Sequence, residues 1–585
     1  MFGSIIDITD NIIILENISG KIETNLLHIH VAFVENSRKI IGEIIKITKE
    51  QFTIMLLGEM KDSFFQSGML KPPTMSATCR IISQNELELL IGSQDYASKN
   101  RLLIGQSLNY EGYKVTVDKN SFFSNHFAIV GNTGTGKSCA VARIIQNIFY
   151  YNKEAIPINA HLVLFDIYGE YHNAFSQMGN IPGIKVRKVT TEVTEDNSEL
   201  ISIPPYFLDV DDLAILLEVQ DSSLLSILEK TLQFVYIFKS TDPKAEEYKN
   251  DMIAKCLLDI LSSGKNPTQI RDQIVSILMK YNTPSLNLNS EIVQPGYTRT
   301  FQQCLNIDAQ GKINAIQFVV DFLSKWNKTE LQLNLLGDNF IYDLDDIYYA
   351  LEFALLSEGT LNSQSMYDKA NTLKVRLHAI INSPMKKYFQ VTNPISKEEY
   401  IHQMFQTPMK ESVQIINMNF DFVDDRFAKI LTKIFSRLFF QFATHLNERG
   451  SFPIHIILEE AHRYVNSDSD TKILGYNIFD RITKEGRKYG IIIGFITQRP
   501  SELSETSLSQ CSNFISLKLF HPEDLKVITA IASNVTSRDI EKIKQLRPGC
   551  ALAFGTSFPL PVLVKFDLPN PLPDSSNINV SETWF

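Results

Sequence analysis

The residues best suited to chemistry in this sequence form a glycine-rich stretch, GNTGTGKS, at positions 131–138. Its spacing matches G-x-x-x-x-G-K-[ST], a pattern in which backbone N–H groups at a helix N-terminus surround phosphate oxygens, the lysine reaches the β and γ phosphates, and the serine binds Mg²⁺. Apolar residues before and after it predict strand, loop and helix. The alternative is an accidental glycine-rich turn. The motif instead predicts nucleotide binding by Gly131, Asn132, Thr133, Gly134, Thr135, Gly136, Lys137, Ser138 and Cys139.

Two adjacent carboxylates, Glu459 and Glu460, end a mostly apolar stretch at 453–458. A strand that ends in two acids is the arrangement with which nucleotide hydrolases hold Mg²⁺ and polarise the attacking water. By position, Glu459 serves the metal and Glu460 serves the water. Glutamate is one methylene longer than the aspartate usual at the first position, so we expect Glu459 to reach the ion through a water. The alternative is the solvated start of a helix.

Two further polar positions follow apolar runs that read as buried strands. Asp166 follows the run 161–165, and Gln498 comes after the run 491–496. Ligands of parallel sheets bind at the carboxyl ends of the strands, so we expect Asp166 and nearby Glu170 to lie close to the phosphates. Gln498 should lie within reach of the water at the γ-phosphate. For Asp166 the alternative is an acidic turn that caps the strand.

The elements that position these residues alternate between buried strands and helices, which predicts an α/β fold with a parallel sheet. Short β-rich runs, one of them at 87–91, predict a small N-terminal β-barrel. Helical periodicity predicts a helical insertion with a loop at 282–296, and 101–124 reads as a linker and lead-in strand. The expected domains are the barrel at 1–112, the first part of the core at 113–206, the insertion at 207–394, the second part of the core at 395–560 and a tail at 561–585.

Composition narrows the class of protein. The 585 residues are 44% hydrophobic and 21% charged, which is typical of a folded chain with several domains. With a net charge of −10, any contact with nucleic acid must come from a local basic patch. Six scattered cysteines read as reduced thiols, and His28 and His30 read as packed or solvated residues of one strand face rather than metal ligands. There is no basic leader and no run of membrane-spanning length, so we expect a cytoplasmic protein.

Two surface features each have two interpretations. The stretch 474–488 predicts one helix with apolar residues on one face and Arg481, Lys484 and Lys488 on another. Such a basic stripe is most often solvated, but it is also the best local candidate for contact with a phosphate backbone. The proline-containing stretch 569–585 predicts an extended arm. We prefer a neighbouring subunit as its surface; a frayed terminus is the alternative.

Taken together, several motifs resemble the HerA branch of the HerA/FtsK group of hexameric DNA-pumping ATPases, across nearly the whole chain. They are His126 before GNTGTGKS, D-x-x-G-E-Y at 166–171, EEAHRY at 459–464, EGRKYG at 485–490, TQRP around Gln498 and LRPGCALAFG at 546–555. The resemblance implies a RecA-like core with a helical insertion, an N-terminal β-barrel that docks a partner enzyme, and a C-terminal tail that braces the adjacent subunit. It places the metal at Ser138 and Glu459 and the catalytic roles at Lys137, Glu460, Gln498 and Arg487. Arg487 would enter a neighbour's site; the alternative is a solvated basic residue.

The resemblance further implies a bacterial homohexamer that uses ATP and Mg²⁺ to translocate on double-stranded DNA, with unwinding left open. A separate effector encoded nearby, a nuclease or a sirtuin-like NADase, would act with it in DNA end processing or, as we prefer, in anti-phage defence. Two other classes stay open: a motor of the conjugation or secretion type, and a nucleotide-stabilised scaffold ring for an effector. ATP turnover with and without duplex DNA separates the motor from the scaffold.

Overall fold

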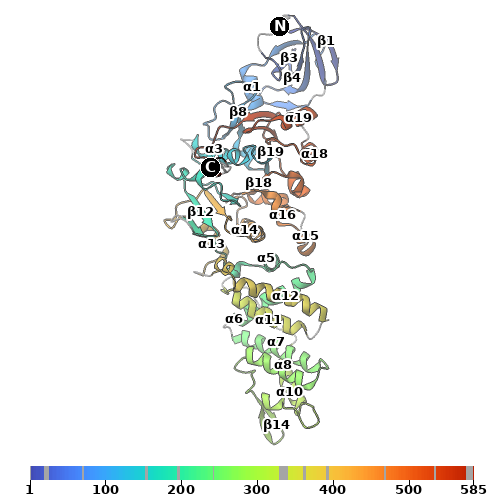
Figure 1. Cartoon of the computed structure of the whole chain (residues 1–585), viewed down its shortest axis with the longest axis vertical. Helices are drawn as coiled ribbons and strands as arrows, with labels where there is room; N and C mark the ends of the chain where they lie inside the picture. The colour runs from blue at the N-terminus through green and yellow to red at the C-terminus, as the bar shows by residue number, and fades with distance from the viewer. Residues whose placement is uncertain are drawn as a thin grey trace. The chain divides into compact units, whose positions relative to one another are not determined.

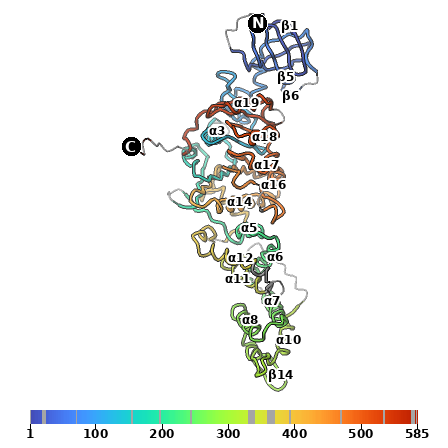
Figure 2. Tube along the Cα trace, turned by 45° about the vertical axis from the view of Figure 1, so that its right-hand side comes forward, coloured from blue at the N-terminus to red at the C-terminus, as the bar shows by residue number. Residues whose placement is uncertain are grey.

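The chain folds into two compact units in the computed structural model (Figure 1, Figure 2). Unit 1 comprises residues 1–200, 400–468 and 476–585, and unit 2 comprises residues 201–399 and 469–475. Unit 2 therefore interrupts the chain of unit 1 twice. The structure describes residues 2–18, 25–68, 71–151, 156–193, 198–240, 243–328, 340–359, 364–390, 394–466, 469–532, 535–574, 581 and 584.

The N-terminal part of unit 1 is an antiparallel sheet of β1 (Phe2–Thr9), β2 (Ile12–Asn17), β3 (His30–Glu35), β4 (Arg38–Ile47), β5 (Gln51–Met60), β6 (Phe65–Ser67) and β7 (Thr78–Ile81). The order is β1-β2-β5-β4-β3-β7, with β6 paired to β5. Buried residues alternate along β5 because successive side chains point to opposite faces of a sheet. Among the described residues, β1 and β7 lie close together without pairing, so backbone hydrogen bonds do not close the expected barrel.

The prediction of a strand at 87–91 is wrong, because these residues form the end of helix α1 (Gln84–Ile91). Ser83 and Glu86 form a capping box, in which each side chain accepts a hydrogen bond from the other residue's backbone N–H. Leu87, Leu90 and Ile91 of the run are buried along one face of this helix. A short apolar run fits both a strand and a helix, and here the cap favours the helix.

The rest of unit 1 contains a mixed sheet of β8 (Arg101–Ser107), β9 (Lys114–Asp118), β10 (Phe127–Val130), β11 (Leu162–Asp166), β12 (Val186–Thr190), β13 (Ser198–Leu200), β16 (Ile415–Asn419), β17 (Ile454–Leu458), β18 (Ile491–Thr497), β19 (Asn513–Ser516), β20 (Cys550–Gly555) and β21 (Val562–Lys565). The order is β13-β12-β16-β11-β17-β18-β10-β19-β20-β21-β8-β9. Strands β13 to β19 in this order are parallel, and the remainder are antiparallel. The parallel strands β10, β11, β16 and β18 are buried along their whole length, as expected for a sheet covered on both faces.

Helices connect the parallel strands, as crossover connections require. The long amphipathic helix α14 (Asp425–His445) joins β16 to β17. The helix expected at 474–488 is confirmed only over α16 (Ile478–Glu485). Leu474 instead ends a separate helix that belongs to unit 2, α15 (Ser469–Leu474), and Gly475 follows it in the left-handed region at φ 79°. The other helices of this part are α2 (Lys119–Phe123), α3 (Lys137–Tyr150), α4 (His172–Phe175), α13 (Lys397–Met404), α17 (Glu505–Ser509), α18 (Pro522–Ile531) and α19 (Ser537–Gln545).

Unit 2 is mainly helical, with α5 (Val210–Leu216), α6 (Leu225–Lys239), α7 (Pro243–Ser262), α8 (Pro267–Lys280), α9 (Phe301–Cys304), α10 (Ile316–Ser324), α11 (Leu344–Gly359) and α12 (Gln364–Ile381). The loop expected at 282–296 is only partly a loop, because β14 (Glu291–Gln294) pairs with β15 (Tyr297–Thr300) across a turn at Gly296, where φ is 86°. No helix in the described ranges is both long and apolar enough to cross a bilayer.

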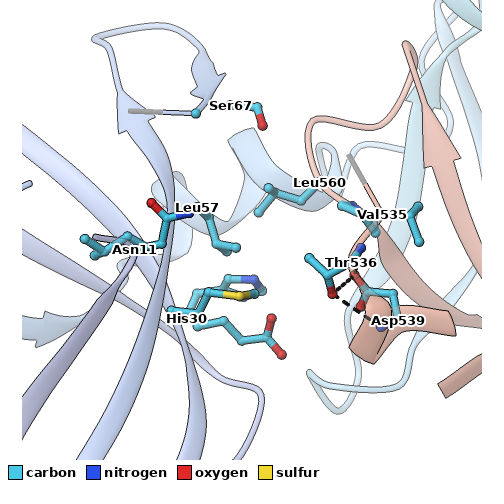
Figure 3. A pocket seen from close by; sticks show the side chains of 13 residues that line it. Asn11, His30, Leu57, Ser67, Val535, Thr536, Asp539 and Leu560 are labelled. Atoms are coloured by element: carbon cyan, nitrogen blue, oxygen red, sulfur yellow. Dashed lines mark hydrogen bonds between the residues drawn. The ribbon is translucent and has the colours of Figure 1, made fainter. Parts of the chain in front are cut away.

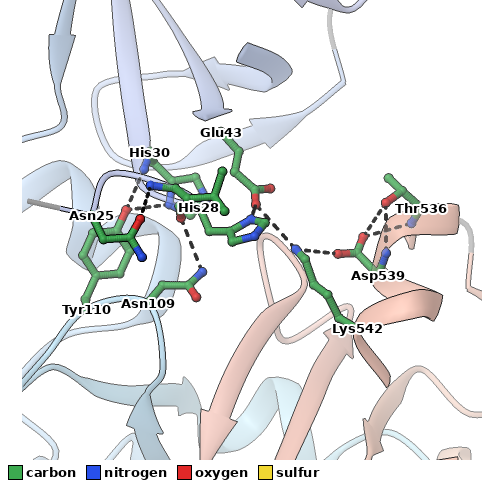
Figure 4. Close-up of polar contacts among 10 residues, drawn as sticks. Asn25, His28, His30, Glu43, Asn109, Tyr110, Thr536, Asp539 and Lys542 are labelled. Carbon is green, nitrogen blue, oxygen red and sulfur yellow. Dashed lines mark hydrogen bonds and ion pairs between the residues drawn. The ribbon is translucent and has the colours of Figure 1, made fainter. Parts of the chain in front are cut away.

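A polar network connects the N-terminal sheet to α19 within unit 1 (Figure 4). Nζ of Lys542 lies 3.4 Å from Oε1 of Glu43 and 3.1 Å from Oδ1 of Asp539. His28 contacts Glu43 at 2.6 Å from a left-handed turn before β3, so it does not share a strand face with His30. Burial opposes the shift, but the hydrogen bond from His28 and the charge of Lys542 hold the pKa of Glu43 below its ordinary value.

A cavity of about 420 Å³ lies beside this network, between the N-terminal sheet and the start of α19 (Figure 3). Thr536 and Asp539 line it and form the capping box of α19, so their polar groups bond each other. A single apolar cluster crosses the same boundary, from Ala32 in the N-terminal sheet to Val562 in β21. The two sheets of unit 1 are therefore joined by both apolar packing and charge.

The described part of the C-terminal arm, up to Asp574, bonds its own chain. That a neighbouring subunit provides a surface for the arm stays a prediction, and most of residues 575–585 lie outside the described ranges. Tyr150 Oη donates a hydrogen bond to the Asn570 carbonyl at 2.9 Å, and Asn173 Nδ2 donates to the Leu572 carbonyl at 3.1 Å. These partners belong to α3 and α4. Backbone carbonyls of the arm therefore accept hydrogen bonds from α3 and α4, partners that the sequence pattern could not identify.

His161 should make folding stability depend on pH. Its ring stacks on Phe452 at 3.7 Å and its Nδ1 lies 3.1 Å from the Pro453 carbonyl, and burial lowers its pKa from 6.5 to about 4. Between pH 6.5 and pH 4, His161 therefore binds a proton more readily in the unfolded chain than in the folded one. The stability that neutral His161 provides is complete above pH 6.5 and is lost as the pH falls towards 4. Between pH 7 and pH 5 this loss is about 2 kcal/mol.

We expect His161→Phe to lose less thermal stability than the wild type between pH 7 and pH 5, as measured by the shift of the unfolding midpoint at each pH. His521 is 60% exposed on its side chain, and His521→Phe is the matched control, which should keep the wild-type pH dependence. Equal slopes for His161→Phe and the wild type would exclude His161 as a source of this dependence.

Candidate nucleotide-binding and hydrolysis site

The glycine-rich loop lies between β10 and α3, at the carboxyl end of the parallel strands, and the predicted strand, loop and helix are confirmed. Gly136 is the N-cap of α3 in a left-handed conformation, at φ 90° and ψ 24°, and Gly134 has φ 75°. A side chain would be strained at either position. No side chain caps α3, so the N–H groups of its first turn can bind an anion.

Contacts from two other segments hold the loop in shape. The N–H of Gly549 donates to the Thr135 carbonyl at 2.9 Å, from the segment that leads into β20. Thr133 Oγ1 donates to Oε1 of Gln498, so Gln498 lies against the tip of the loop. The sequence motif at 546–555 had no assigned role, and this contact with Thr135 supplies one.

Lys137 and Glu460 form a buried ion pair. Nζ of Lys137 lies 3.3 Å from Oε1 of Glu460, with 8% and 10% of the two side chains exposed. The backbone of Glu460 is left-handed, at φ 46° and ψ 44°. Such a conformation costs a non-glycine residue about 1–3 kcal/mol and is concentrated at functional sites. Oε2 of Glu460 lies 3.3 Å from Nδ1 of His462 but has no hydrogen-bond partner among the described residues.

Glu459 has the environment of a cation ligand. Only 2% of it is exposed, and its Oε2 has no hydrogen-bond partner in the described part of the chain. Burial raises the pKa of Glu459 well above its ordinary value, and the negative charges of Asp166, Glu170 and Glu460 add to this effect. A divalent cation would neutralise this excess of negative charge.

The residues around this carboxylate fit Mg²⁺ bound together with a nucleotide. Within the described ranges there is no group of three or more His, Cys, Asp or Glu side chains that could hold a metal by itself. Mg²⁺ commonly binds through one or two carboxylates together with substrate phosphates and waters. Ser138 and Glu459 provide oxygen ligands of this kind, and the N–H groups at the start of α3, which no side chain caps, would hold the phosphates.

Asp166 lies at the end of β11, but its own turn uses its carboxylate. It accepts hydrogen bonds from the N–H groups of Glu170 and Tyr171, each at 3.0 Å, and Asn417 Nδ2 donates to it at 3.3 Å. Burial raises the pKa of Asp166 to about 6. These contacts favour the acidic turn over direct contact with a ligand.

Glu170 is the acidic residue of this turn that reaches the loop. Its Oε2 accepts a hydrogen bond from Ser138 Oγ at 2.9 Å. The sequence placed Glu170 near the phosphates without a role, because nothing in the pattern showed that Asp166 caps the turn that aims Glu170 at Ser138. An acid four residues after the aspartate, next to a glycine, was the signal that could have found it.

Arg487 lies away from the nucleotide site of its own chain. It is exposed, in the short 3₁₀ helix Gly486–Tyr489 that precedes β18. The glycine-rich loop and Gln498 lie beyond the opposite, carboxyl ends of β10 and β18. With seven residues in β18, these two edges of the sheet are roughly 20 Å apart. Arg487 therefore cannot contact phosphates bound at its own loop.

The fold and the site together define a P-loop ATPase of mixed α/β type. Residues 102–439 match the family described as the central domain of helicase HerA. This match covers more than half of the chain, so the chain belongs to the HerA helicase family. It is an ATP-hydrolysing enzyme of the helicase type.

Similar proteins are found in archaea. A probable helicase, MJECL08, of Methanocaldococcus jannaschii is 26% identical over 457 residues, which are 77% of this chain and 68% of the relative. The DNA double-strand break repair helicase HerA of Sulfolobus acidocaldarius is 22% identical over 532 residues, which are 91% of this chain and 80% of the relative. Among solved structures, the plasmid coupling protein TrwB with a non-hydrolysable ATP analogue is 11% identical, with a TM-score of 0.42 over 85% of this chain and 95% of that chain.

Proposed function

We propose that this chain is the subunit of a homohexameric motor that hydrolyses ATP at subunit interfaces and translocates on double-stranded DNA. The observation that carries the proposal is the separation between Lys137 and Glu460 at one edge of the sheet and Arg487 at the other. In a ring whose subunits meet edge to edge, Arg487 of one subunit can complete the site of the next. Such an arginine stabilises the charge of the transition state.

Within one subunit, each side chain of the site has a proposed task. Lys137 would hold the phosphates, and Ser138 and Glu459 would hold Mg²⁺, which lowers the repulsion between phosphate oxygens when it is bound. Glu460 would accept hydrogen bonds from the attacking water and take its proton. Gln498, next to the tip of the loop, would sense the γ-phosphate. Relatives named as helicases and the buried charge at Glu459 support this assignment.

The DNA-binding part of the proposal rests on the names of the relatives and on local charge. One relative is named as a DNA double-strand break repair helicase. The overall charge of −10 requires a local basic surface, and Lys484 and Lys488 are exposed on and after α16. The guanidinium of Arg481, in the same stripe, lies over the rings of Phe440 and Tyr476, so these rings cover part of it.

The partner is proposed by family resemblance. The N-terminal sheet would act as a barrel-like docking domain for a nuclease or a sirtuin-like NADase, in cytoplasmic anti-phage defence or DNA end processing. The core would be RecA-like. Residues beyond Asp574 would brace the adjacent subunit, while the arm before them stays on its own chain.

ATP turnover should rise several-fold when duplex DNA is added to the purified ring, because translocation couples hydrolysis to movement along DNA. Phosphate release measured with no DNA, single-stranded DNA and duplex DNA checks this, with native mass spectrometry to establish the ring. Lys137→Ala should remove both the basal and the stimulated rate, which shows that the activity belongs to this site. Binding of ATP without turnover under all three conditions would favour the scaffold and overturn the motor.

A further inference from the structure

The turn at 166–171, which carries Glu170, is held by contacts with the phosphate loop and with the C-terminal arm. In front, the carboxylate of Glu170 accepts the hydroxyl of Ser138 at 2.9 Å. Asp166 fixes the turn from within by accepting its N–H groups, and Gly169, at φ 69°, packs against the side chain of Asn419 so closely that any Cβ there would clash. These contacts fix the backbone of the turn, and the hydrogen bond from Ser138 directs the Glu170 carboxylate.

The C-terminal arm contacts the backbone of this turn. The N–H of Asp574 donates to the Glu170 carbonyl at 2.7 Å. Gln146 of α3, which has 0% exposure, accepts from the Asn570 N–H at 2.9 Å and donates to the Pro571 carbonyl at 3.0 Å. A buried amide costs about 1–3 kcal/mol when its bonds are lost, so Gln146 ties the arm to the helix that begins at the phosphate loop.

We propose that Glu170 is a positioning residue for the metal-binding half of the nucleotide site, and that residues 570–574 hold it in place from the same subunit. The inference rests on the proposed function, because it assumes that Ser138 and Glu459 hold Mg²⁺. Glu170 acts through Ser138: its carboxylate accepts a hydrogen bond from the serine hydroxyl, which leaves the lone pairs of the serine oxygen directed to the cation. Outer partners of this kind commonly change metal affinity by about 10–100-fold.

Charge supports the same role, because the carboxylate of Glu170 lies 2.9 Å from Ser138 Oγ and brings a negative charge next to this proposed cation ligand. Glutamine at position 170 would keep the size of the side chain and remove this charge.

The test measures nucleotide binding as a function of Mg²⁺ concentration, with a fluorescent ATP analogue and the full-length protein. Glu170→Gln should need about tenfold more Mg²⁺ for half-maximal binding, while its binding without Mg²⁺ stays at the wild-type level. Mn²⁺, which binds such sites more tightly, should restore most of the difference. An unchanged Mg²⁺ requirement would overturn the role of Glu170. A wild type that binds no nucleotide would instead overturn the proposed function.

Two truncations test the arm. A chain that ends at Leu568 loses the contacts of 570–574 and should shift the Mg²⁺ requirement in the same direction as Glu170→Gln. A chain that ends at Asp574 keeps those contacts and should keep the Mg²⁺ requirement of the wild type. If the two truncations give the same Mg²⁺ requirement, the arm does not position Glu170.

A cross-link decides whether the arm acts in cis, and it does not depend on either truncation folding. Cysteines at positions 173 and 572, joined by a short bis-maleimide, should yield a product of single-chain mass, because Asn173 bonds the Leu572 carbonyl of its own chain at 3.1 Å. Each single substitution is the control for native cysteines. A dimer-mass product that requires both cysteines would place the arm on a neighbour and contradict the inference.

Discussion

Replacing Glu460 with glutamine is expected to reduce ATP turnover by about 10²–10⁴-fold while ATP binding persists. The amide keeps the size of the side chain but cannot take a proton from the attacking water. Binding should survive because Lys137, which lies 3.3 Å from Oε1 of Glu460, loses a competing partner and stays free for phosphate oxygens. Glutamate and glutamine have the same backbone strain in the left-handed conformation at position 460, so the substitution adds no new strain there.

Steady-state phosphate release and equilibrium binding of a fluorescent ATP analogue measure the two halves of this result. Glu448→Gln is the matched control, since Glu448 is exposed and lies before β17, away from the carboxyl end of that strand. It should keep the wild-type rate. Unchanged turnover in Glu460→Gln would exclude Glu460 as the base. Loss of both binding and turnover would show that Glu460 supports the site's structure instead.

Arg487→Ala is expected to lower turnover by about 10³–10⁵-fold, the effect of removing an arginine that stabilises transition-state charge in other nucleotide hydrolases. The variant keeps the whole of its own glycine-rich loop, because Arg487 lies at the other edge of the sheet. Nucleotide binding to the isolated subunit should therefore be unaffected. Arg449→Ala is the matched control, because Arg449 is also exposed and lies over the ring of Tyr489, two residues after Arg487.

Mixed rings separate action in trans from action in cis. Arg487→Ala and Lys137→Ala should each be inactive alone. When the two are mixed, the loop of an Arg487→Ala subunit can meet Arg487 of a Lys137→Ala neighbour, so part of the wild-type rate should return. Native mass spectrometry must show that both variants share one ring. Mixed rings without any recovery would place the action of Arg487 elsewhere.

The glycine-rich loop and the buried parallel strands of the core were predictable from residue types alone. The loop needs glycine where φ is positive, and lysine and serine at its end. The pattern of residue types therefore predicts the local backbone conformation directly. The buried parallel strands are continuous apolar runs for a similar reason, since both faces are covered. Acidic and amide residues after such strands had to meet at one edge of the sheet.

Local patterns with two solutions needed the tertiary structure. The run 87–91 fits a strand and a helix equally well until the cap formed by Ser83 and Glu86 is seen. The helix expected over 474–488 divides at Gly475, which sequence periodicity does not detect. The capping box of Ser83 and Glu86 settled the first case, and Gly475 settled the second.

The roles of Asp166 and Glu170, and the surface of the C-terminal arm, were decided only by tertiary contacts. Both acids lie in one motif, yet one caps its own turn and the other bonds Ser138. The arm finds Gln146 some 424 residues earlier in the chain, and no local pattern encodes that pairing. Residue types specify which chemistry is possible at a position. The direction in which a side chain points depends on backbone hydrogen bonds made across the whole fold, and these exist only once distant segments have packed.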